Sequence, residues 1–282
     1  MLPIIDSHCH IYPDKIAAKA TAATEVFYGI NHTELDGTVS LLIKEGTKAG
    51  VSHFIVQSVA TTPQQVSSIN RFIADTVKSG GGRFTGLGTL HPDSSDIKGD
   101  IEEIIALGLK GVKLHPDIQR FKLDDYRCLK IYENCEGKLP ILIHTGDSRY
   151  DYSNTNRLMP ILEIYKELTV IGAHFGGWSL WKRATNELCE KHFPNFYVDC
   201  SSSFYALSDK EIKELISAYG DDRVLFGTDY PMWNPRAEVK RFLSLGLSKK
   251  TQEKILYKNA CGLFGIETPK PVEEKEIDLE TI

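Results

Sequence analysis

The chain has 282 residues, of which 41% are hydrophobic and 25% charged, and its formal net charge is -5. This composition is ordinary for a soluble globular protein, and the length suits one large α/β domain. A negative net charge without a basic run argues against a nucleic acid as partner.

The N-terminus enters an apolar, strand-like run at once, without the charged and long apolar regions of a secretion signal. No apolar stretch is long enough to cross a bilayer. We therefore expect a cytoplasmic protein with no membrane partner. The six cysteines are scattered without a CxxC pair, which favours reduced core thiols over a disulfide framework.

Strand-like and helix-like runs alternate along the whole chain. The apolar, strand-like runs are 4–10, 53–60, 84–91, 111–115, 140–145, 169–175, 196–201 and 223–229. Amphipathic patterns lie between them, and Ser208 is a suitable N-cap for a helix that begins at Asp209. Eight strands that alternate with helices predict a single (β/α)8 TIM barrel. The alternative, a doubly wound open sheet, normally has a Gly-rich turn after its first strand, where this chain has His8-Cys9-His10.

Two segments depart from this repeat. Residues 11–36 form a long connection with Tyr12, Phe27 and Tyr28, which we expect to be a loop that acts as a lid or a substrate wall. Residues 267–282 are charged and poor in core residues. We expect a barrel domain over 1–266 and a C-terminal tail over 267–282 that is flexible or lies on the surface.

Histidines gather where the strand-like runs end. They are His8, His10, His91, His115, His144 and His174, and the last run ends in Asp229. The carboxyl ends of the strands meet at one mouth of a parallel barrel. Imidazoles and a carboxylate there suit one divalent ion, Zn²⁺ first, with Mn²⁺ or Fe²⁺ as alternatives. A lone His-x-His pair is more often structural, but the other strand ends supply the missing ligands.

Four short blocks carry a resemblance to a known family. They are Ile5-Asp6-Ser7-His8-Cys9-His10, Pro140-Ile141-Leu142-Ile143-His144-Thr145-Gly146, Ala173-His174-Phe175-Gly176-Gly177 and Leu225-Phe226-Gly227-Thr228-Asp229-Tyr230-Pro231. Together they resemble the amidohydrolase-related family, in the branch that contains aminocarboxymuconate-semialdehyde decarboxylase and the "amidohydrolase 2" proteins. The resemblance covers nearly all of residues 4–266. It is specific for the fold and the metal site and weak for the substrate.

The resemblance implies that His8, His10, His144 and Asp229 hold one divalent metal. It implies that His174 acts beside the metal, on the bound water or the substrate. A bound cation lowers the pKa of water toward neutrality, Asp229 can take the proton of that water, and His174 can orient it. Packed, structural histidines are the competing interpretation.

Lys113 and His115 are predicted to face into the barrel together, because residues two apart share one face of a strand. Lys113 is either a charged lysine that meets a substrate carboxylate or, as in two-metal relatives, a carboxylated bridge between metals. His115 is either a substrate contact or a hydrogen-bonded strand end. Asp6 either anchors an imidazole N–H beneath the metal or pairs with an internal cation. His91 is expected to be structural or peripheral.

Aromatic and basic side chains follow the later strands. Arg149 and Trp178 are predicted to contact the substrate, a small molecule such as a cyclic or aromatic carboxylate. Loop tryptophans also pack lids or subunit interfaces, so a homodimer is an open alternative.

Two reactions compete for this site. The first is metal-dependent hydrolysis of an amide, ester or lactone by the metal-activated water. The alternative is nonoxidative decarboxylation of an unsaturated or aromatic acid, a lyase reaction on the same ligands. A TatD-type nuclease needs a glutamate near the middle strands, where this chain has Leu90-His91 and Leu114-His115. A barrel without chemistry is disfavoured because no expected ligand is missing.

Overall fold

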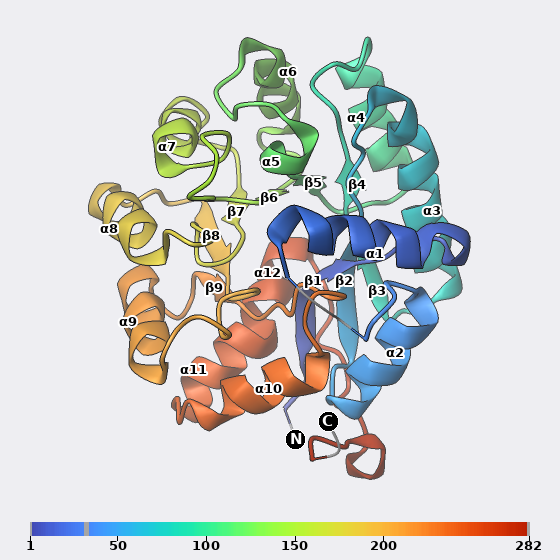
Figure 1. Cartoon of the computed structure of the whole chain (residues 1–282), viewed down its shortest axis with the longest axis vertical. Coiled ribbons are helices and arrows are strands. Elements are labelled where there is room, and N and C mark those ends of the chain that lie inside the picture. Colours follow the sequence, from blue (N-terminus) through green and yellow to red (C-terminus); the bar gives the residue numbers. More distant parts are fainter. Residues whose placement is uncertain (1, 31–33, 281–282) are drawn as a thin grey trace.

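The strand-like runs form a closed parallel barrel with the helices around it (Figure 1). The computed structural model describes residues 2–30 and 34–280. Its strands are β1 (Ile5–His10), β2 (His53–Gln57), β3 (Phe84–Gly86), β4 (Gly88–Thr89), β5 (Val112–Leu114), β6 (Ile141–Ile143), β7 (Val170–Gly172), β8 (Phe196–Asp199) and β9 (Val224–Leu225).

The α-helices are α1 (Asp14–Tyr28), α2 (Val39–Lys48), α3 (Val66–Ser79), α4 (Ile97–Ala106), α5 (Pro116–Gln119), α6 (Tyr126–Cys135), α7 (Thr155–Ile164), α8 (Trp181–Lys191), α9 (Asp209–Tyr219), α10 (Pro235–Ser244), α11 (Lys249–Glu253) and α12 (Asn259–Phe264). Short 3-10 turns lie at Pro63–Gln65 and Glu274–Glu276, and a π-turn at Lys254–Lys258 joins α11 to α12. Ser208 caps α9 as predicted. Within the described part of the chain, no helix has the length and apolarity that a bilayer span requires.

The barrel is closed by hydrogen bonds between its last and first strands. Parallel ladders run through β1-β2-β3 and through β4 to β9 in chain order. β3 and β4 are halves of one strand interrupted at Leu87, so eight strands of the described residues surround the axis. The Ser7 N–H donates to the Phe226 carbonyl at 2.8 Å, and the His10 N–H donates to the Tyr230 carbonyl at 2.7 Å. The predicted (β/α)8 barrel is confirmed.

An apolar cluster fills the barrel interior below its mouth. Ile5, Ile55, Leu142 and Leu225 pack there, and Phe264 of α12 joins the same cluster. These strands are buried on both sides, which is why their sequences are continuously apolar. The polar residues come later along the same strands and therefore stand at the carboxyl ends.

Most strands are shorter than predicted and end before their histidine. β6 ends at Ile143 and β7 at Gly172, so His144 and His174 stand on backbone that has already left the ladder. Apart from His8 and His10 on β1 and Lys113 on β5, the predicted site residues therefore stand in the connections, where side-chain directions no longer alternate as in a strand.

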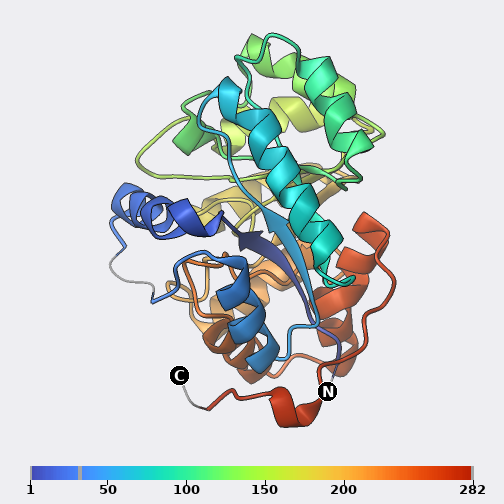
Figure 2. The same ribbon diagram turned by 90° about the vertical axis from the view of Figure 1, so that its right-hand side faces the viewer.

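The segment 11–36 departs from the prediction of a loop. It contains α1, a helix of 15 residues that crosses the mouth of the barrel (Figures 1 and 2). Its alanine-rich sequence has high helix propensity but little hydrophobic periodicity, and periodicity is what the prediction relied on. Gly29 ends the helix in the left-handed conformation, with φ of 65°. Residues 31–33 of this segment lie outside the described residues.

The end of the chain lies against the outside of α2 and α10. The Asp278 N–H donates to the Lys48 carbonyl at 2.8 Å, and Lys240 Nζ lies 3.1 Å from Glu280 Oε2. The described part of the tail therefore lies on the surface, which is one of the two arrangements expected from the sequence.

Candidate metal centre

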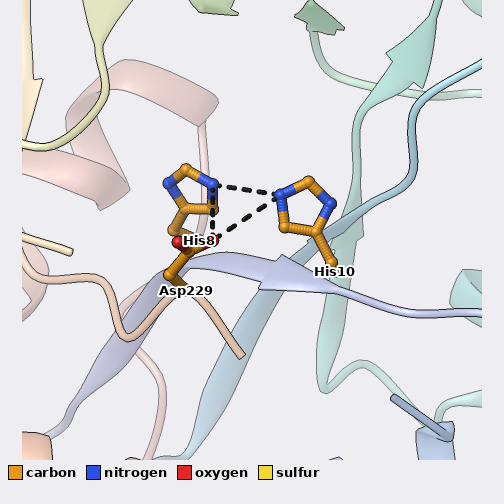
Figure 3. A group of neighbouring side chains, drawn as sticks. All are labelled: His8, His10 and Asp229. Atoms are coloured by element: carbon orange, nitrogen blue, oxygen red, sulfur yellow. Dashed lines mark hydrogen bonds and ion pairs between the residues drawn. The ribbon is translucent and has the colours of Figure 1, made fainter. Parts of the chain in front are cut away.

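Three of the four predicted ligands converge at the junction of β1 and β9 (Figure 3). His8 Nε2 lies 3.3 Å from His10 Nε2 and 3.3 Å from Asp229 Oδ1. His10 Nε2 lies 3.7 Å from the same oxygen. The first strand supplies both imidazoles from one face, and the connection after β9 supplies the carboxylate.

The spacing of these donor atoms fits a divalent ion. Ligand atoms about 2.0–2.1 Å from a tetrahedral ion lie roughly 3.3 Å apart, close to the separations of this group. Burial lowers the pKa of His8 and of His10 well below the usual range, so both rings are neutral, as metal ligands must be.

The hydrogen bond of His8 Nδ1 determines which ring nitrogen of His8 can bind a metal. Nδ1 lies 2.8 Å from Asp199 Oδ2 at the end of β8, and both side chains are fully buried. Because the carboxylate accepts the Nδ1–H, Nε2 keeps its lone pair and points to the ligand group. Asp199 also accepts from the Ser201 hydroxyl and from the His174 N–H, so it ties together three residues of the mouth.

The carboxylate of Asp229 is fixed in the same manner. Its Oδ2 accepts a 2.5 Å hydrogen bond from the Ser202 hydroxyl, which in turn accepts from the Trp233 indole at 2.7 Å. Only Oδ1 is left to face the two imidazoles. Ser202 and Trp233 therefore set the direction of the third candidate ligand.

His174 and His144 face each other with free nitrogens. His174 Nδ1 donates to the Ser201 carbonyl at 3.0 Å, and His144 Nε2 donates to the Gly146 carbonyl at 3.1 Å. His174 Nε2 and His144 Nδ1 then keep lone pairs, 3.0 Å apart. Burial lowers the pKa of His174 to about 3 and that of His144 well below its usual range, so no proton is shared. His144 Nδ1 also lies 3.4 Å from the Tyr28 hydroxyl, and His144 lies outside the convergent group of His8, His10 and Asp229.

A second set of histidine and aspartate side chains lies beside β5 and β6. His115, Asp117 and His144 are close together and buried. The two imidazole rings are stacked, with centroids 4.0 Å apart and planes 7° apart. Lone pairs lie in the ring plane, so those of stacked rings run parallel and do not converge on one ion. This set therefore has the composition of a metal site without its geometry.

Lys113 stands at the floor of the site. Its side chain is fully buried, and Nζ lies 3.2 Å from His8 Nε2. Among the described residues it forms no ion pair with a carboxylate, although Asp229 and Asp199 are near enough to favour its charge. Burial lowers the pKa of Lys113 and raises that of Asp229. A buried ammonium group without a paired anion is the group most in need of one from the substrate.

The backbone of two site residues is strained. His174 and Asp229 have φ of 59° and 61°, in the left-handed region that ordinary side chains seldom adopt. Each such residue costs on the order of 1–3 kcal/mol and persists only where its surroundings hold it. Here Asp199 binds the His174 N–H and Ser202 binds the Asp229 carboxylate. The strain directs both side chains inward.

A cavity of about 570 Å³ opens onto the ligand group. The sequence predicted that Lys113 and His115 share a face, and both line this cavity. Tyr28, at the end of α1, also lines it and places its hydroxyl 2.7 Å from His115 Nε2. Part of residues 11–36 thus lines the cavity as a helix, and its role as a substrate wall stays a prediction.

Arg149 and Trp178 were predicted as substrate contacts, but neither lines the cavity. The Arg149 guanidinium is bound by both oxygens of Asp147 and donates to the Phe27 carbonyl at 2.6 Å. Trp178 packs edge-on against Tyr28, with centroids 4.9 Å apart. Arg149 is thus occupied by Asp147 and the Phe27 carbonyl, and Trp178 by Tyr28. Both side chains therefore hold α1 over the mouth of the barrel.

Two other expectations are resolved by hydrogen bonds. Asp6 accepts from the Thr228 N–H at 2.9 Å and from its hydroxyl at 2.6 Å, so it fixes the β9 connection and binds neither an imidazole nor a cation. His91 accepts from the Asp93 N–H at 3.2 Å and is absent from the cavity lining, as expected for a peripheral residue.

Asp199 is the residue that sequence analysis missed. Like Asp229, it is a carboxylate at the end of an apolar strand, and that signal was available. It was obscured because the run 196–201 continues through Cys200 and Ser201 without a histidine.

The comparisons with known proteins agree with this geometry. The fold is a metal-site TIM barrel, and the model of the amidohydrolase family matches residues 5–266. The chain therefore belongs to the amidohydrolase family.

Several solved structures share the fold. An uncharacterised TIM-barrel protein from Bordetella bronchiseptica is 24% identical with a TM-score of 0.76, over 94% of this chain and 99% of that one. The 5-carboxyvanillate decarboxylase LigW2 from Novosphingobium aromaticivorans, with bound manganese and 3-methoxy-4-hydroxy-5-nitrobenzoic acid, is 18% identical with a TM-score of 0.74, over 94% and 97%. A candidate 2-pyrone-4,6-dicarboxylic acid hydrolase from Pseudomonas putida is 21% identical with a TM-score of 0.68, over 95% and 99%.

Proposed function

We propose that this protein is a metal-dependent, nonoxidative decarboxylase of an unsaturated or aromatic carboxylic acid. The observation that carries the proposal is Lys113, a buried ammonium group at the floor of the cavity and beside His8, which forms no ion pair with a carboxylate of the described residues. A carboxylate substrate supplies the missing anion. The similarity in fold to a manganese-containing decarboxylase supports the same reaction.

His8, His10 and Asp229 would hold the metal. His144, predicted as a fourth ligand, lies outside their convergent group. Imidazoles with one carboxylate suit Zn²⁺ or Mn²⁺, and we take Zn²⁺ as the first candidate. When bound, such an ion supplies a positive charge that stabilises negative charge on substrate oxygens and lowers the pKa of water.

The chain's own residues then bind the acid and hold the water that supplies one proton. Lys113 Nζ pairs with the carboxylate and orients it. The bond between the carboxyl carbon and its neighbour breaks, CO2 leaves, and the electron pair stays on that neighbouring carbon. A water molecule that hydrogen-bonds to Asp229 and His174 delivers a proton to this carbon, and hydroxide is left behind. Substrate carboxylate and water thus give CO2, the protonated product and hydroxide, so atoms and charge balance.

His174 keeps a hydrogen-bond acceptor in the site. Its Nδ1–H is committed to the Ser201 carbonyl, so Nε2 can accept only from a substrate hydroxyl or a water. α1 and Tyr28 cover the mouth and limit the access of bulk water.

Hydrolysis of an amide, ester or lactone is the second candidate. His174 Nε2 and Asp229 can both accept a proton from water at the same ligand group, and a candidate pyrone hydrolase shares the fold. Lys113 does not favour this reaction, because a neutral amide, ester or lactone brings no anion to pair with its ammonium group.

The test is release of labelled CO2 by the Zn²⁺- or Mn²⁺-loaded protein. A panel of aromatic and unsaturated acids labelled with ¹³C in the carboxyl group is incubated in D2O. We expect ¹³CO2 and one deuterium on the product carbon. Lys113→Met should lower kcat/KM about 10–100-fold, whereas Lys110→Met, an exposed matched control, should leave it unchanged. Turnover of esters or lactones without CO2 from any acid would replace this proposal by hydrolysis.

A further inference from the structure

The cavity extends well beyond the ligand group. Its inner end is polar, and its outer part lies between two helices whose lining side chains are mostly apolar, with Thr24 and Ser68 as polar exceptions. From α1 the apolar residues are Ile16, Ala20, Ala23 and Phe27, and from α3 they are Ile69 and Phe72. The α1 residues recur at helical spacing and form one continuous stripe.

This groove is much longer than a single ring. Tyr28 stands over the inner end, where it bonds to His115, and Ile16 lies twelve residues earlier in the same helix. Twelve residues of α-helix span about 18 Å. A ring acid whose carboxylate reaches Lys113 fills the inner end and leaves the part beside Ile16 and Ala20 empty.

The groove is preformed and open to solvent. Arg149 fixes α1 through the Phe27 carbonyl, and the buried Asp147 holds that guanidinium in place. The wall therefore stands without a ligand, which reduces the ordering cost of binding. Ile16 is 51% exposed, so part of the apolar stripe remains in water. Apolar surface that adjoins a polar reaction centre is the arrangement of a site for amphipathic ligands.

We propose that the groove between α1 and α3 binds an apolar chain carried by the substrate acid. The substrate class is then an unsaturated or aromatic carboxylic acid with an extended alkyl or similar apolar substituent. The carboxylate lies at Lys113 and the chain runs outward along Ala20 to Ile16. This inference rests on the proposed function for the position of the carboxylate, whereas the groove itself rests on the geometry of α1 and α3.

The test uses 4-alkylbenzoates, from benzoate to 4-octylbenzoate, as binding probes for the Zn²⁺- or Mn²⁺-loaded protein. Affinity is measured by calorimetry and so does not depend on turnover. Each methylene that leaves water for an apolar wall should tighten Kd about fourfold until the groove is full. Benzoate alone should bind weakly, and Lys113→Met should weaken all members alike.

Three variants separate the groove from a general apolar effect. Ala20→Trp fills the groove and should end the gain at a shorter chain while benzoate binds as before. Ile16→Glu places a charge at the outer end and should weaken only the longest members. Ala18→Trp is the matched control, an exposed residue of the same helix outside the cavity lining, and should change nothing.

The outcomes distinguish this inference from the proposed function. Equal affinity along the series, with benzoate still dependent on Lys113, overturns the chain site and leaves the carboxylate site intact. The chain site is also overturned if affinity rises up to the same chain length in Ala20→Trp as in the unchanged protein. Failure of every member to bind overturns the carboxylate site itself and removes the anchor of the chain.

Discussion

Among the described residues, three groups of two imidazoles and one carboxylate lie at the barrel mouth, and one of them, His8, His174 and Asp199, shares His8 with another. The other two share no residue and differ in geometry. His8, His10 and Asp229 gather at β1 and β9, and His115, Asp117 and His144 gather at β5 and β6. Each group is two imidazoles and a carboxylate within a short distance. The difference between them lies in where the ring nitrogens point and what their second nitrogens bind.

In the first group, the outer nitrogen of His8 is bound by Asp199, and Nε2 is left to face the other ligands. In the second, the imidazole rings are stacked, so their lone pairs lie in parallel planes and do not converge on one ion. Proximity of suitable residue types is therefore insufficient. A site needs convergent lone pairs, which the neighbours of each imidazole determine.

Removal of a ligand from each group gives the largest contrast. We expect His8→Ala or His10→Ala to lose the bound metal, since two of three convergent donors cannot hold it, and His115→Ala to retain it. Metal per protein is measured by elemental analysis after dialysis. Undiminished metal content in His10→Ala would show that the metal site does not include β1.

The outer carboxylates give the next contrast. Asp199→Asn can no longer hold the Nδ1–H of His8 as a charged acceptor, and we expect metal affinity to fall about 10–100-fold. Asp117→Asn, in the other group, should leave metal affinity within a factor of two or so. Both are measured by competition with a chelator. Equal losses in the two variants would erase the distinction between the groups.

A pH-dependent contrast follows from the buried carboxylate of the second group. Burial raises the pKa of Asp117 to about 7, from a usual 3.8. The folded state therefore holds its proton more tightly than the unfolded chain, and stability falls as pH rises from about 4 through 7. Asp117→Asn removes this loss and should raise the free energy of unfolding at pH 8 by on the order of 2 kcal/mol, with little change at pH 4.

Urea unfolding of the metal-loaded protein at the two pH values checks this expectation. Asp117 is not one of the three candidate ligands, so the effect should persist in the loaded protein. An effect of Asp117→Asn that is independent of pH would show that the carboxyl group does not titrate in this range.

The smallest expected effect concerns Tyr28. Tyr28→Phe removes the 2.7 Å hydrogen bond to His115 and should lower the free energy of unfolding by about 1 kcal/mol, with metal affinity unchanged. Tyr126→Phe, at a residue that is 79% exposed, is the control and should have no effect. A large loss of metal in Tyr28→Phe would instead connect the second group to the first.

Much of the fold could be predicted because each strand has a clear local signal. Runs such as 141–143 are buried on both faces and are apolar throughout, and a polar residue that marks the barrel mouth follows them. α1 escaped because the stripe of Ile16, Ala20, Ala23 and Phe27, although at helical spacing, consists half of alanine, which is only a weak apolar signal.

The sequence by itself determined the barrel, the family and the residue types at the mouth, because these depend on local patterns and on motifs such as His8-Cys9-His10. Only the tertiary structure decided which imidazoles converge, since ring direction depends on partners such as Asp199 that are distant in the chain. It also placed Arg149 against α1 and left Lys113 unpaired, because an ion pair depends on which side chains the closed barrel brings together.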